Sequence, residues 1–466
     1  MMDGEAGNIS WNVALRAFRS VSAEDLMFPV LLQLIVIIVS ARLCASLLRR
    51  FGQPGVVGEI AAGLILGPSV LGALFPQFSQ MLFHPPLHGV PIELSDVGFK
   101  WIFSTIAHLG LILLLFLIGL EFDFSHLKVN SRAALAISLT GVVLPFGLGV
   151  LLAPWILPHL EQHPEATGPI PALGLALFLG TALSITAIPI LGRIMLEMNI
   201  TRTRLGTLTI SSAAIDDAAG WILLATVAAL VKGKFAILDT LLMLGETLAF
   251  AAFMIWGVRP LLRTWARKAG AERNLSLTDL AVLFCILFGC AIVTNRIGIF
   301  AIFGAFLLGA VLSEEVAFRE AAARKLRDFV MAFFLPIFFT YTGLRTNIGS
   351  LETATQWMLC GLVLLAAIAG KFGGCLLAAR WSGFPWRDAA CIGTLMNTRA
   401  LMELIVINIG YDLQVIPPSL YCMLVLMALV TTFMTTPILI WLMPGTEIEP
   451  CIRNSEFQRF LKGSSS

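Results

Sequence analysis

The stretch 206-GTLTISSAAIDDAAGWILLATVAAL-230 has the length and apolar character of a membrane span, yet Asp216 and Asp217 stand side by side near its middle. A charge near the bilayer centre costs about 2.5–3.5 kcal/mol on insertion scales. Thr209, Ser212 and Asp216 follow helical spacing and share one face, with Asp217 turned about 100° away. Small residues around the pair allow close helix packing. We therefore expect a helix surrounded by protein, with the acid pair as a functional site.

The composition of the whole chain supports a membrane location for this stretch. Of its 466 residues, 58% are hydrophobic and 13% are charged, and the mean hydropathy is +0.89. Soluble domains carry about 25% charged residues. Apolar runs of about 20 residues recur along the chain without an alternating pattern, which indicates helices rather than a β-barrel. The sequence thus predicts an all-α polytopic membrane protein.

The apolar runs predict thirteen membrane spans joined by short loops, so we expect a single membrane domain over residues 26–443. The second and ninth spans have the weakest apolar signal. The predicted spans are 26–48, 54–74, 101–121, 131–157, 171–192, 205–231, 235–257, 276–296, 297–315, 327–345, 355–380, 386–410 and 416–443.

Lysine and arginine set the expected orientation, because positive residues accumulate in cytoplasmic loops. The loops after odd-numbered spans, with the C-terminal tail, hold 21 of these residues, and the other loops with the N-terminal tail hold 7. We expect the N-terminus outside and the C-terminus in the cytoplasm. Residues 1–25 lack an apolar signal core, so we expect an extracytoplasmic tail there and a short cytoplasmic tail over 444–466.

Neither the cysteines nor the basic residues suggest another class of site. The eight cysteines show no CxxC spacing and lie almost entirely in or beside apolar runs, so we interpret them as packing residues. No basic patch with interleaved aromatic residues indicates nucleic-acid binding. We expect no cofactor and no enzymatic activity.

A second charge lies deep in the eleventh span, where 364-LLAAIAGKFGGCLLAAR-380 contains Lys371. It is about nine residues from the nearer end, or roughly 13 Å at the rise of an α-helix, too far for the side chain to reach water comfortably. Two adjacent carboxylates need a nearby cation to remain ionised together. Lys371 is a candidate for that cation. A purely structural ion pair is the alternative, but two acids and one base leave one acid free for a mobile cation.

The fifth predicted span, 180-GTALSITAIPILG-192, reads as an interrupted helix. Pro189 removes a backbone donor and frees carbonyl groups one turn earlier. Unwound backbone and helix ends in a transporter bind ions, so we take Ser184 and Thr186 as candidate ligands of a transported cation.

The twelfth predicted span, 393-GTLMNTRALMELIVINIG-410, is the second interrupted helix. Asn397, Thr398, Arg399 and Glu403 are its polar residues. Interruptions at matched positions predict that spans four to six and eleven to thirteen are repeats of opposite topology. Arg399 and Glu403 have i, i+4 spacing, which fits an ordinary intrahelical pair as well as a functional role.

Three other polar residues within spans are weaker candidates. Glu246 lies alone in the seventh span, where it could face a crevice. We interpret Glu59 as a structural residue near a cytoplasmic helix end and His108 as a buried, hydrogen-bonded histidine.

The chain resembles the monovalent cation:proton antiporter-2 family of bacterial sodium/proton and potassium/proton exchangers over about residues 26–443. No single short motif carries this resemblance. It is carried by 52-GQPGVVGEIAAGLILGPSVLG-72, 109-LGLILLLFLIGLEFD-123, 180-GTALSITAIPIL-191, 215-IDDAAGWILLA-225, 335-LPIFFTYTGLRTNI-348, 371-KFGG-374 and 396-MNTRALMELIV-406.

The resemblance implies a thirteen-span antiporter fold with inverted repeats and two discontinuous crossing helices, usually as a homodimer. It implies a moving core around 131–231 and 355–443, a dimer scaffold around 26–121 and 276–345, and a linker helix over 235–257. For a bacterial member of this family, the expected location is the inner cell membrane.

The resemblance also assigns roles within the site. It implies that Asp217 is the cation and proton carrier and that Asp216 pairs with Lys371, an arrangement associated with electrogenic exchange of two protons per cation. The helix crossing corresponds to Ser184–Thr186 and Asn397–Arg399. One departure is Ala400, because the family usually has glycine after the arginine of the twelfth span.

The sequence therefore favours a secondary antiporter that exchanges Na⁺ or Li⁺ for protons, with a role in cation homeostasis and pH regulation. A K⁺/H⁺ antiporter is the close alternative. A cation channel, an organic-anion symporter and a non-transporting sensor are the alternatives of a different class, and the acid pair argues against an anion site.

Overall fold

The structure is a computed structural model of the chain. It describes residues 22–51, 53, 55–86, 92–121, 132–161, 170–186, 188–201, 203–232, 237–270, 275–298, 300–399 and 401–453. Residues 1–21 of the predicted N-terminal tail, residues 454–466 of the C-terminal tail and Ala400 lie outside the described part.

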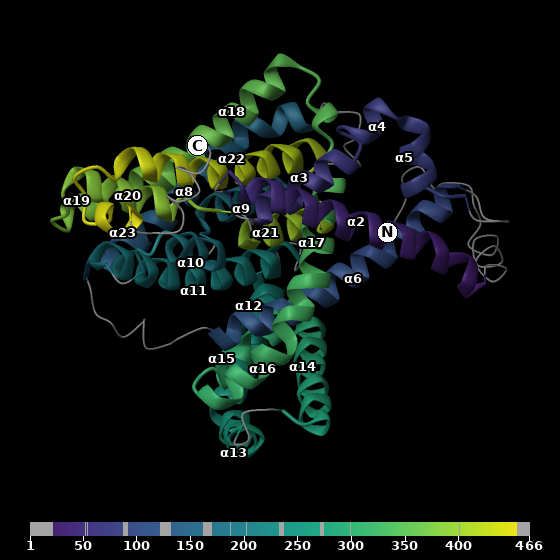
Figure 1. Cartoon of the computed structure of the whole chain (residues 1–466), viewed down its shortest axis with the longest axis horizontal. Coiled ribbons are helices and arrows are strands. Elements are labelled where there is room, and N and C mark those ends of the chain that lie inside the picture. The colour runs from purple at the N-terminus through teal and green to yellow at the C-terminus, as the bar shows by residue number, and fades with distance from the viewer. Residues whose placement is uncertain are drawn as a thin grey trace.

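The first half of the described chain forms helices joined by short connections (Figure 1). These are α2 (Ala23–Arg49), α3 (Gly55–Leu66), α4 (Leu71–Leu74), α5 (Pro76–Phe83), α6 (Ile92–Glu121), α8 (Arg132–Glu161), α9 (Ala172–Ser184), α10 (Ile188–Glu197), α11 (Arg204–Lys232), α12 (Ile237–Ala252), the π-helical η1 (Phe253–Val258) and α13 (Arg259–Gly270).

The second half continues in the same way. Its elements are α14 (Leu277–Ile297), α15 (Ala301–Leu312), α16 (Val316–Phe329), the π-helical η2 (Val330–Phe334), α17 (Leu335–Leu344), the 3₁₀ turn η3 (Ile348–Ser350), α18 (Ala354–Ile368), the π-helical η4 (Ala369–Gly373), α19 (Gly374–Trp381), α20 (Trp386–Met396), α21 (Leu401–Asp412), α22 (Pro418–Leu442) and α23 (Glu449–Arg453).

Within the described residues, ten helices are long and apolar enough to cross a membrane, and α9 and α15 are shorter apolar helices. Every predicted span has a helical counterpart, and the fifth and twelfth are interrupted, as expected. This confirms the all-α membrane fold. The total of thirteen spans remains a prediction.

Two predicted loops are helical, which corrects the predicted span boundaries. The seventh span does not end at 257 but continues through η1 into α13, and the charged segment before the tenth span forms α16. Both segments are amphipathic: α13 buries Leu262 and Ala266, and Phe318 of α16 packs against Trp265 with ring centroids 5.1 Å apart. Charged residues do not end a helix whose apolar face is buried.

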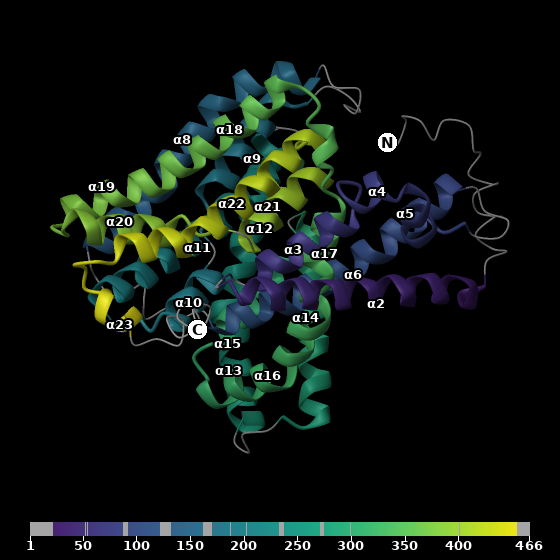
Figure 2. The ribbon, with the colours of Figure 1, turned by 45° about the horizontal axis from the view of Figure 1, so that its top comes forward.

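The helices pack in two groups. Helices α8, α9 and α11 contact one another and the segments from α18 to α21, and α22 packs against α18, α20 and α21. In the second group, α3 packs with α2 and α17, and α6 packs with α15 and α17, with α14 against α15. Figure 2 shows α8, α18 and α19 on the side of the molecule opposite the free end of α2. Helix α12 contacts α11 of the first group and α14 of the second.

Glycines allow the closest helix contacts in the second group. A Cβ on Gly309 of α15 would lie 2.2 Å from the Phe116 carbonyl oxygen of α6, and one on Gly119 would lie 2.2 Å from the Phe306 carbonyl oxygen. Such small-residue contacts let helix backbones approach in a membrane, where lipid is as apolar as the helix surface. The spacing of α6 and α15 therefore depends on these glycines.

Replacing Gly309 with alanine is expected to lower the melting temperature of the detergent-solubilised protein, because overpacking typically costs about 1–3 kcal/mol. The matched control is Gly289→Ala on α14, where a Cβ meets nothing within 4 Å. That control should leave the melting temperature unchanged or slightly raised. Equal melting temperatures for both variants, measured by tryptophan fluorescence, would contradict the assigned contact.

Candidate functional site

Two interrupted helices meet at the centre of the first group. Helix α9 ends at Ser184, Ile185 is extended with φ −81° and ψ 141°, and the next helix begins at Ile188. Helix α20 ends at Met396, followed by a non-helical break before α21. The Thr186 hydroxyl lies 3.1 Å from the Met396 carbonyl oxygen, so the two breaks are in direct contact.

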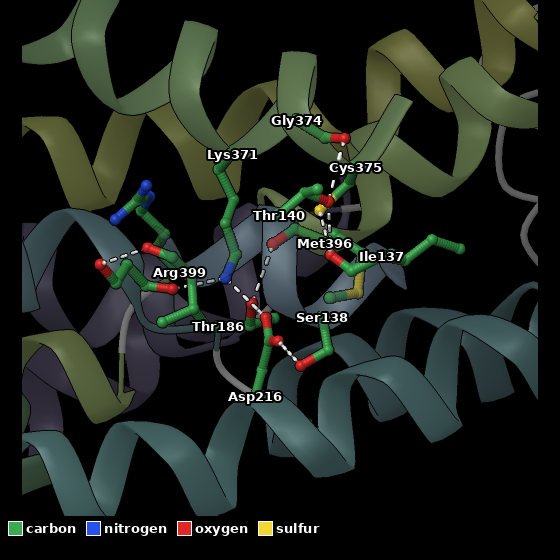
Figure 3. Close-up of polar contacts among 12 residues, drawn as sticks. Ile137, Ser138, Thr140, Thr186, Asp216, Lys371, Gly374, Cys375, Met396 and Arg399 are labelled. Atoms are coloured by element: carbon green, nitrogen blue, oxygen red, sulfur yellow. Dashed lines mark hydrogen bonds and ion pairs between the residues drawn. The ribbon is translucent and has the colours of Figure 1, made fainter. Parts of the chain in front are cut away.

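Asp216 of α11 is fully buried at this crossing and accepts hydrogen bonds from three elements (Figure 3). Lys371 Nζ lies 2.6 Å from Oδ2 and Thr186 Oγ1 lies 3.0 Å from the same oxygen. Ser138 Oγ of α8 lies 2.5 Å from Oδ1. A buried carboxylate needs both a counter-charge and donors to be stable in its ionised form, and this one has both.

Lys371 lies within η4, a π-helical segment where the i→i+5 bonding widens the helix; π segments occur frequently at functional sites. Its side chain is fully buried and forms the predicted ion pair with Asp216. Its ammonium group also donates to the carbonyl oxygen of Ser184, the last residue of α9. Lys371 thus joins the carboxylate to the end of the broken helix.

Asp217 differs sharply from its neighbour. It is 1% exposed, and its Oδ1 has no hydrogen-bond partner among the described residues. A buried, unpartnered carboxylate oxygen is costly to retain. The structure therefore brings together one satisfied acid and one acid with an unused ligand atom.

Arg399 satisfies the carbonyl groups that the break in α9 leaves without helical partners. Its guanidinium donates to the carbonyl oxygens of Ala182 and Leu183 at 2.8 and 2.7 Å, and to that of Ala367 at 3.3 Å. Glu403 lies 3.6 Å from Arg399 Nη1. The predicted i, i+4 pair is present, but Arg399 also crosses to a second helix and stabilises its end.

The other predicted crossing residues, Asn397 and Thr398, are buried, and Thr398 lies against α22. Thr398 Oγ1 lies 3.3 Å from Thr435 Oγ1, and Thr432 donates to the Arg399 carbonyl oxygen at 3.0 Å. Asn397 is buried, and its Oδ1 has no partner within the described part of the chain. Helix α22 thereby supports the second break.

The two candidate cation ligands have protein partners in this state. The Ser184 hydroxyl lies 2.6 Å from the Gly180 carbonyl oxygen and 3.1 Å from that of Val142, while the Ser184 carbonyl accepts from Lys371. The Thr186 hydroxyl contacts Asp216. Both residues lie beside the acid pair, and their role as cation ligands remains a prediction.

Ser138 is the site residue that sequence reasoning missed. It lies within the fourth predicted span beside Thr140, and nothing in its local pattern distinguishes one hydroxyl from the other. Thr140 bonds to the Ala136 carbonyl oxygen of its own helix at 2.7 Å, whereas Ser138 points at Asp216. Only the packing of α8 against α11 separates them.

The weaker candidates lie outside the site. Glu246 is exposed on α12, and Glu59 is buried with its Oε1 3.8 Å from Arg42 Nη1. The interpretation of His108 as a buried histidine is wrong, because half of its side chain is exposed and it lines a cavity. Its predicted hydrogen bonding is confirmed, with Nδ1 2.7 Å from the Ser104 carbonyl oxygen. The pattern around His108 is apolar, so the sequence could not show that cavity.

Comparison with known proteins identifies the class to which this fold and site belong. Residues 35–443 match the family model described as "Sodium/hydrogen exchanger, transmembrane". The chain is 39% identical over 418 residues to the Na⁺/H⁺ antiporter NhaS4 of Synechocystis sp. (strain ATCC 27184 / PCC 6803 / Kazusa), covering 89% of this chain and 97% of that protein. It is 31% identical over 390 residues to K⁺/H⁺ antiporter 1 of Saccharomyces cerevisiae (strain ATCC 204508 / S288c), covering 83% of this chain and 43% of that longer protein.

The fold agrees with this assignment. The sodium proton antiporter MjNhaP1 from Methanocaldococcus jannaschii aligns with a TM-score of 0.51 and 16% identity, covering 92% of this chain and 99% of that one. The protein is an integral-membrane transporter of the cation/proton antiporter class. The chain belongs to the sodium/hydrogen exchanger family.

Removal of Lys371 is expected to destabilise the site, because it leaves Asp216 buried without its counter-charge. Breaking a buried pair in this way costs about 3–5 kcal/mol. Lys371→Met should therefore lower the melting temperature in detergent at pH 8, and a second substitution, Asp216→Asn, should recover much of the loss. Lys325→Met on exposed α16 is the matched control. Equal melting temperatures for the single and double variants would show that the pair is not the stabilising contact.

Proposed function

We propose that this protein exchanges Na⁺ or Li⁺ for protons at Asp216 and Asp217 by alternating access. The observation that carries the proposal is the buried Asp216–Lys371 ion pair beside the unpartnered Asp217 oxygen, at the crossing of two interrupted helices. A buried charge in a membrane span costs free energy. A structural ion pair with Lys371 accounts for Asp216 but not for Asp217.

Asp217 would be the main carrier, because its Oδ1 is available as a ligand. A hard cation prefers oxygen ligands. Within the described residues, no group of three or more His, Cys, Asp or Glu could hold a metal ion. The remaining oxygens would therefore come from Asp216, from the Ser184 and Thr186 region, and from carbonyl groups at the helix breaks.

Coupling of the two ions follows from competition for the same carboxylates. The entering cation displaces protons from Asp217 and from the Asp216–Lys371 pair, and returning protons expel the cation on the other side. The empty, fully ionised site is disfavoured because it leaves a buried charge uncompensated. Displacement of two protons by one monovalent cation makes the exchange electrogenic.

The two packed groups of helices suggest which parts move. Helices α8–α11 and α18–α22 would form the moving core around the site, and α2–α6 with α14–α17 would form the scaffold of a homodimer, with α12 as the linker. The distribution of arginine and lysine supports an outside N-terminus and a cytoplasmic C-terminus. A bacterial inner membrane is the proposed location.

K⁺/H⁺ exchange is the second candidate. The relatives include one named as a Na⁺/H⁺ antiporter and one named as a K⁺/H⁺ antiporter. The carboxylate and carbonyl oxygens at the site accept either ion, so preference would depend on the size of the coordination shell.

Dye-monitored proton movement in proteoliposomes tests both candidates. Na⁺, Li⁺ or K⁺ added to vesicles with an imposed pH gradient should dissipate it, and Asp217→Asn should abolish the response, because the neutral amide cannot exchange a proton. Glu246→Gln, which changes an exposed acid on α12, is the matched control and should remain active. A wild-type protein inert toward all three ions would refute antiport, and a fully active Asp217→Asn variant would remove Asp217 from the mechanism.

A further inference from the structure

Ser138 makes a contact that differs from those of neighbouring hydroxyl groups. Its Oγ lies 2.5 Å from Asp216 Oδ1, and both side chains are buried. The Thr186 hydroxyl, in contrast, is within reach of two acceptors, Asp216 Oδ2 and the Met396 carbonyl oxygen. A hydroxyl donates one hydrogen, so Thr186 can be drawn away from the acid, whereas Ser138 is directed at it.

We infer that Ser138 is a positioning residue that fixes the orientation of the Asp216 carboxylate through the oxygen opposite Lys371. The inference rests on the proposed exchange at the acid pair. An ionised carboxylate only accepts hydrogen bonds, and a charged acceptor makes the bond about twice as strong as a neutral one. Ser138 therefore holds Oδ1 in place while Oδ2 stays paired with Lys371.

The other two donors to this carboxylate differ from Ser138 in kind. Lys371 of η4 carries a charge, and the Thr186 hydroxyl is shared with the Met396 carbonyl oxygen. Ser138 is the donor from α8, so its substitution alters the hydrogen bonding of Asp216 without removing a charge.

The test compares Ser138→Ala with Thr140→Val, a control on the same helix whose hydroxyl lies 2.7 Å from the Ala136 carbonyl oxygen and 3.3 Å from the Gly374 carbonyl oxygen of α19. Loss of the Ser138 donor leaves the Asp216 carboxylate less well oriented for the cation. The apparent KM for Na⁺ should rise about tenfold in Ser138→Ala, as expected for loss of one hydrogen bond to a charged group. Maximal velocity should be retained.

Ser138→Thr keeps a hydroxyl and should restore the wild-type KM, which a merely structural role would not require. An unchanged KM in Ser138→Ala, with wild-type exchange intact, would overturn the inference alone. Loss of cation-dependent proton movement in the wild-type protein would instead refute the proposed function.

A second, independent feature lies away from the acid pair, where α17 meets α21. Arg345 is the C-cap residue that follows α17, and the chain then turns through η3 into α18. Its guanidinium lies 2.7 Å from Asp412 Oδ1 and 3.2 Å from Asn408 Oδ1, both on α21. The group also lies over the Tyr411 ring, 4.5 Å from its centroid.

The Arg345–Asp412 contact lies between two cavities. One, of about 200 Å³, includes His108, Ile302 and Asn408 in its lining, and the other, of about 580 Å³, includes His84 and Lys100. Both are lined by Ser104, Tyr341, Arg345 and Asp412. The Arg345–Asp412 pair therefore stands where the two spaces meet.

We propose that Arg345 and Asp412 form a latch that holds α21 against α17 and closes the smaller cavity. Helix α21 begins immediately after the second break and ends at Asp412. A movement of the site relative to α17 would therefore draw Asp412 away from Arg345. The proposal rests on the alternating-access function. An isolated exposed ion pair contributes little, but here Asn408 and the Tyr411 ring also hold the guanidinium.

Cysteine accessibility tests the latch directly. Ile302→Cys places a thiol in the smaller cavity, where Ile302 is 4% exposed. Labelling by a membrane-impermeant maleimide should be slow in this background and about tenfold faster after Arg345→Gln or Asp412→Asn. The charge-swapped pair Arg345→Asp with Asp412→Arg should return the rate toward the starting value. Protein without Ile302→Cys gives the background from the native cysteines.

Arg296→Gln, which neutralises an exposed arginine elsewhere, is the control and should not change the labelling rate. Equal rates in Arg345→Gln, Asp412→Asn and the parent would overturn the latch. Because labelling needs no transport, its failure is distinct from failure of the antiport assay.

Discussion

The free-energy cost of placing charge inside a membrane shapes this protein more than any other constraint. Asp216 and Lys371 offset one another at 2.6 Å, and hydroxyl groups from α8 and the first break complete the hydrogen bonding of the carboxylate. In the part of the chain that the structure describes, Asp217 Oδ1 has no hydrogen-bond partner. The site is therefore balanced except for one acid, and that imbalance is a physical basis for binding a proton or a cation in alternation.

The interrupted helices are a consequence of the same constraint. Helix α9 stops in the interior and exposes carbonyl groups that lipid cannot solvate. Arg399 donates to two of them, and Lys371 donates to the Ser184 carbonyl oxygen. Both cations thus compensate helix ends as well as carboxylates. A shift of α9 or α20 would therefore move backbone oxygens and charged side chains of the site at the same time.

Much of this architecture could be predicted from the sequence, because membrane burial is a local property of a segment. Apolar length identified the spans, and the improbability of charge within them identified Asp216, Asp217 and Lys371. The helix breaks were indicated by polar residues in spans five and twelve and by Pro189 in span five. The same logic misplaced α13 and α16, because their charges suggested loops while an apolar face, buried by another helix, keeps each segment helical.

The sequence by itself determined that the chain is a helical membrane protein with an acid pair and a lysine in its interior, since no isolated charge is stable in hydrocarbon. Only the tertiary structure decided which groups meet them. Ser138 is 78 residues from Asp216, Lys371 is 187 residues from Ser184, and Arg345 is 67 residues from Asp412. These contacts depend on how helices cross and rotate, which is set by glycine contacts and side-chain packing between distant segments.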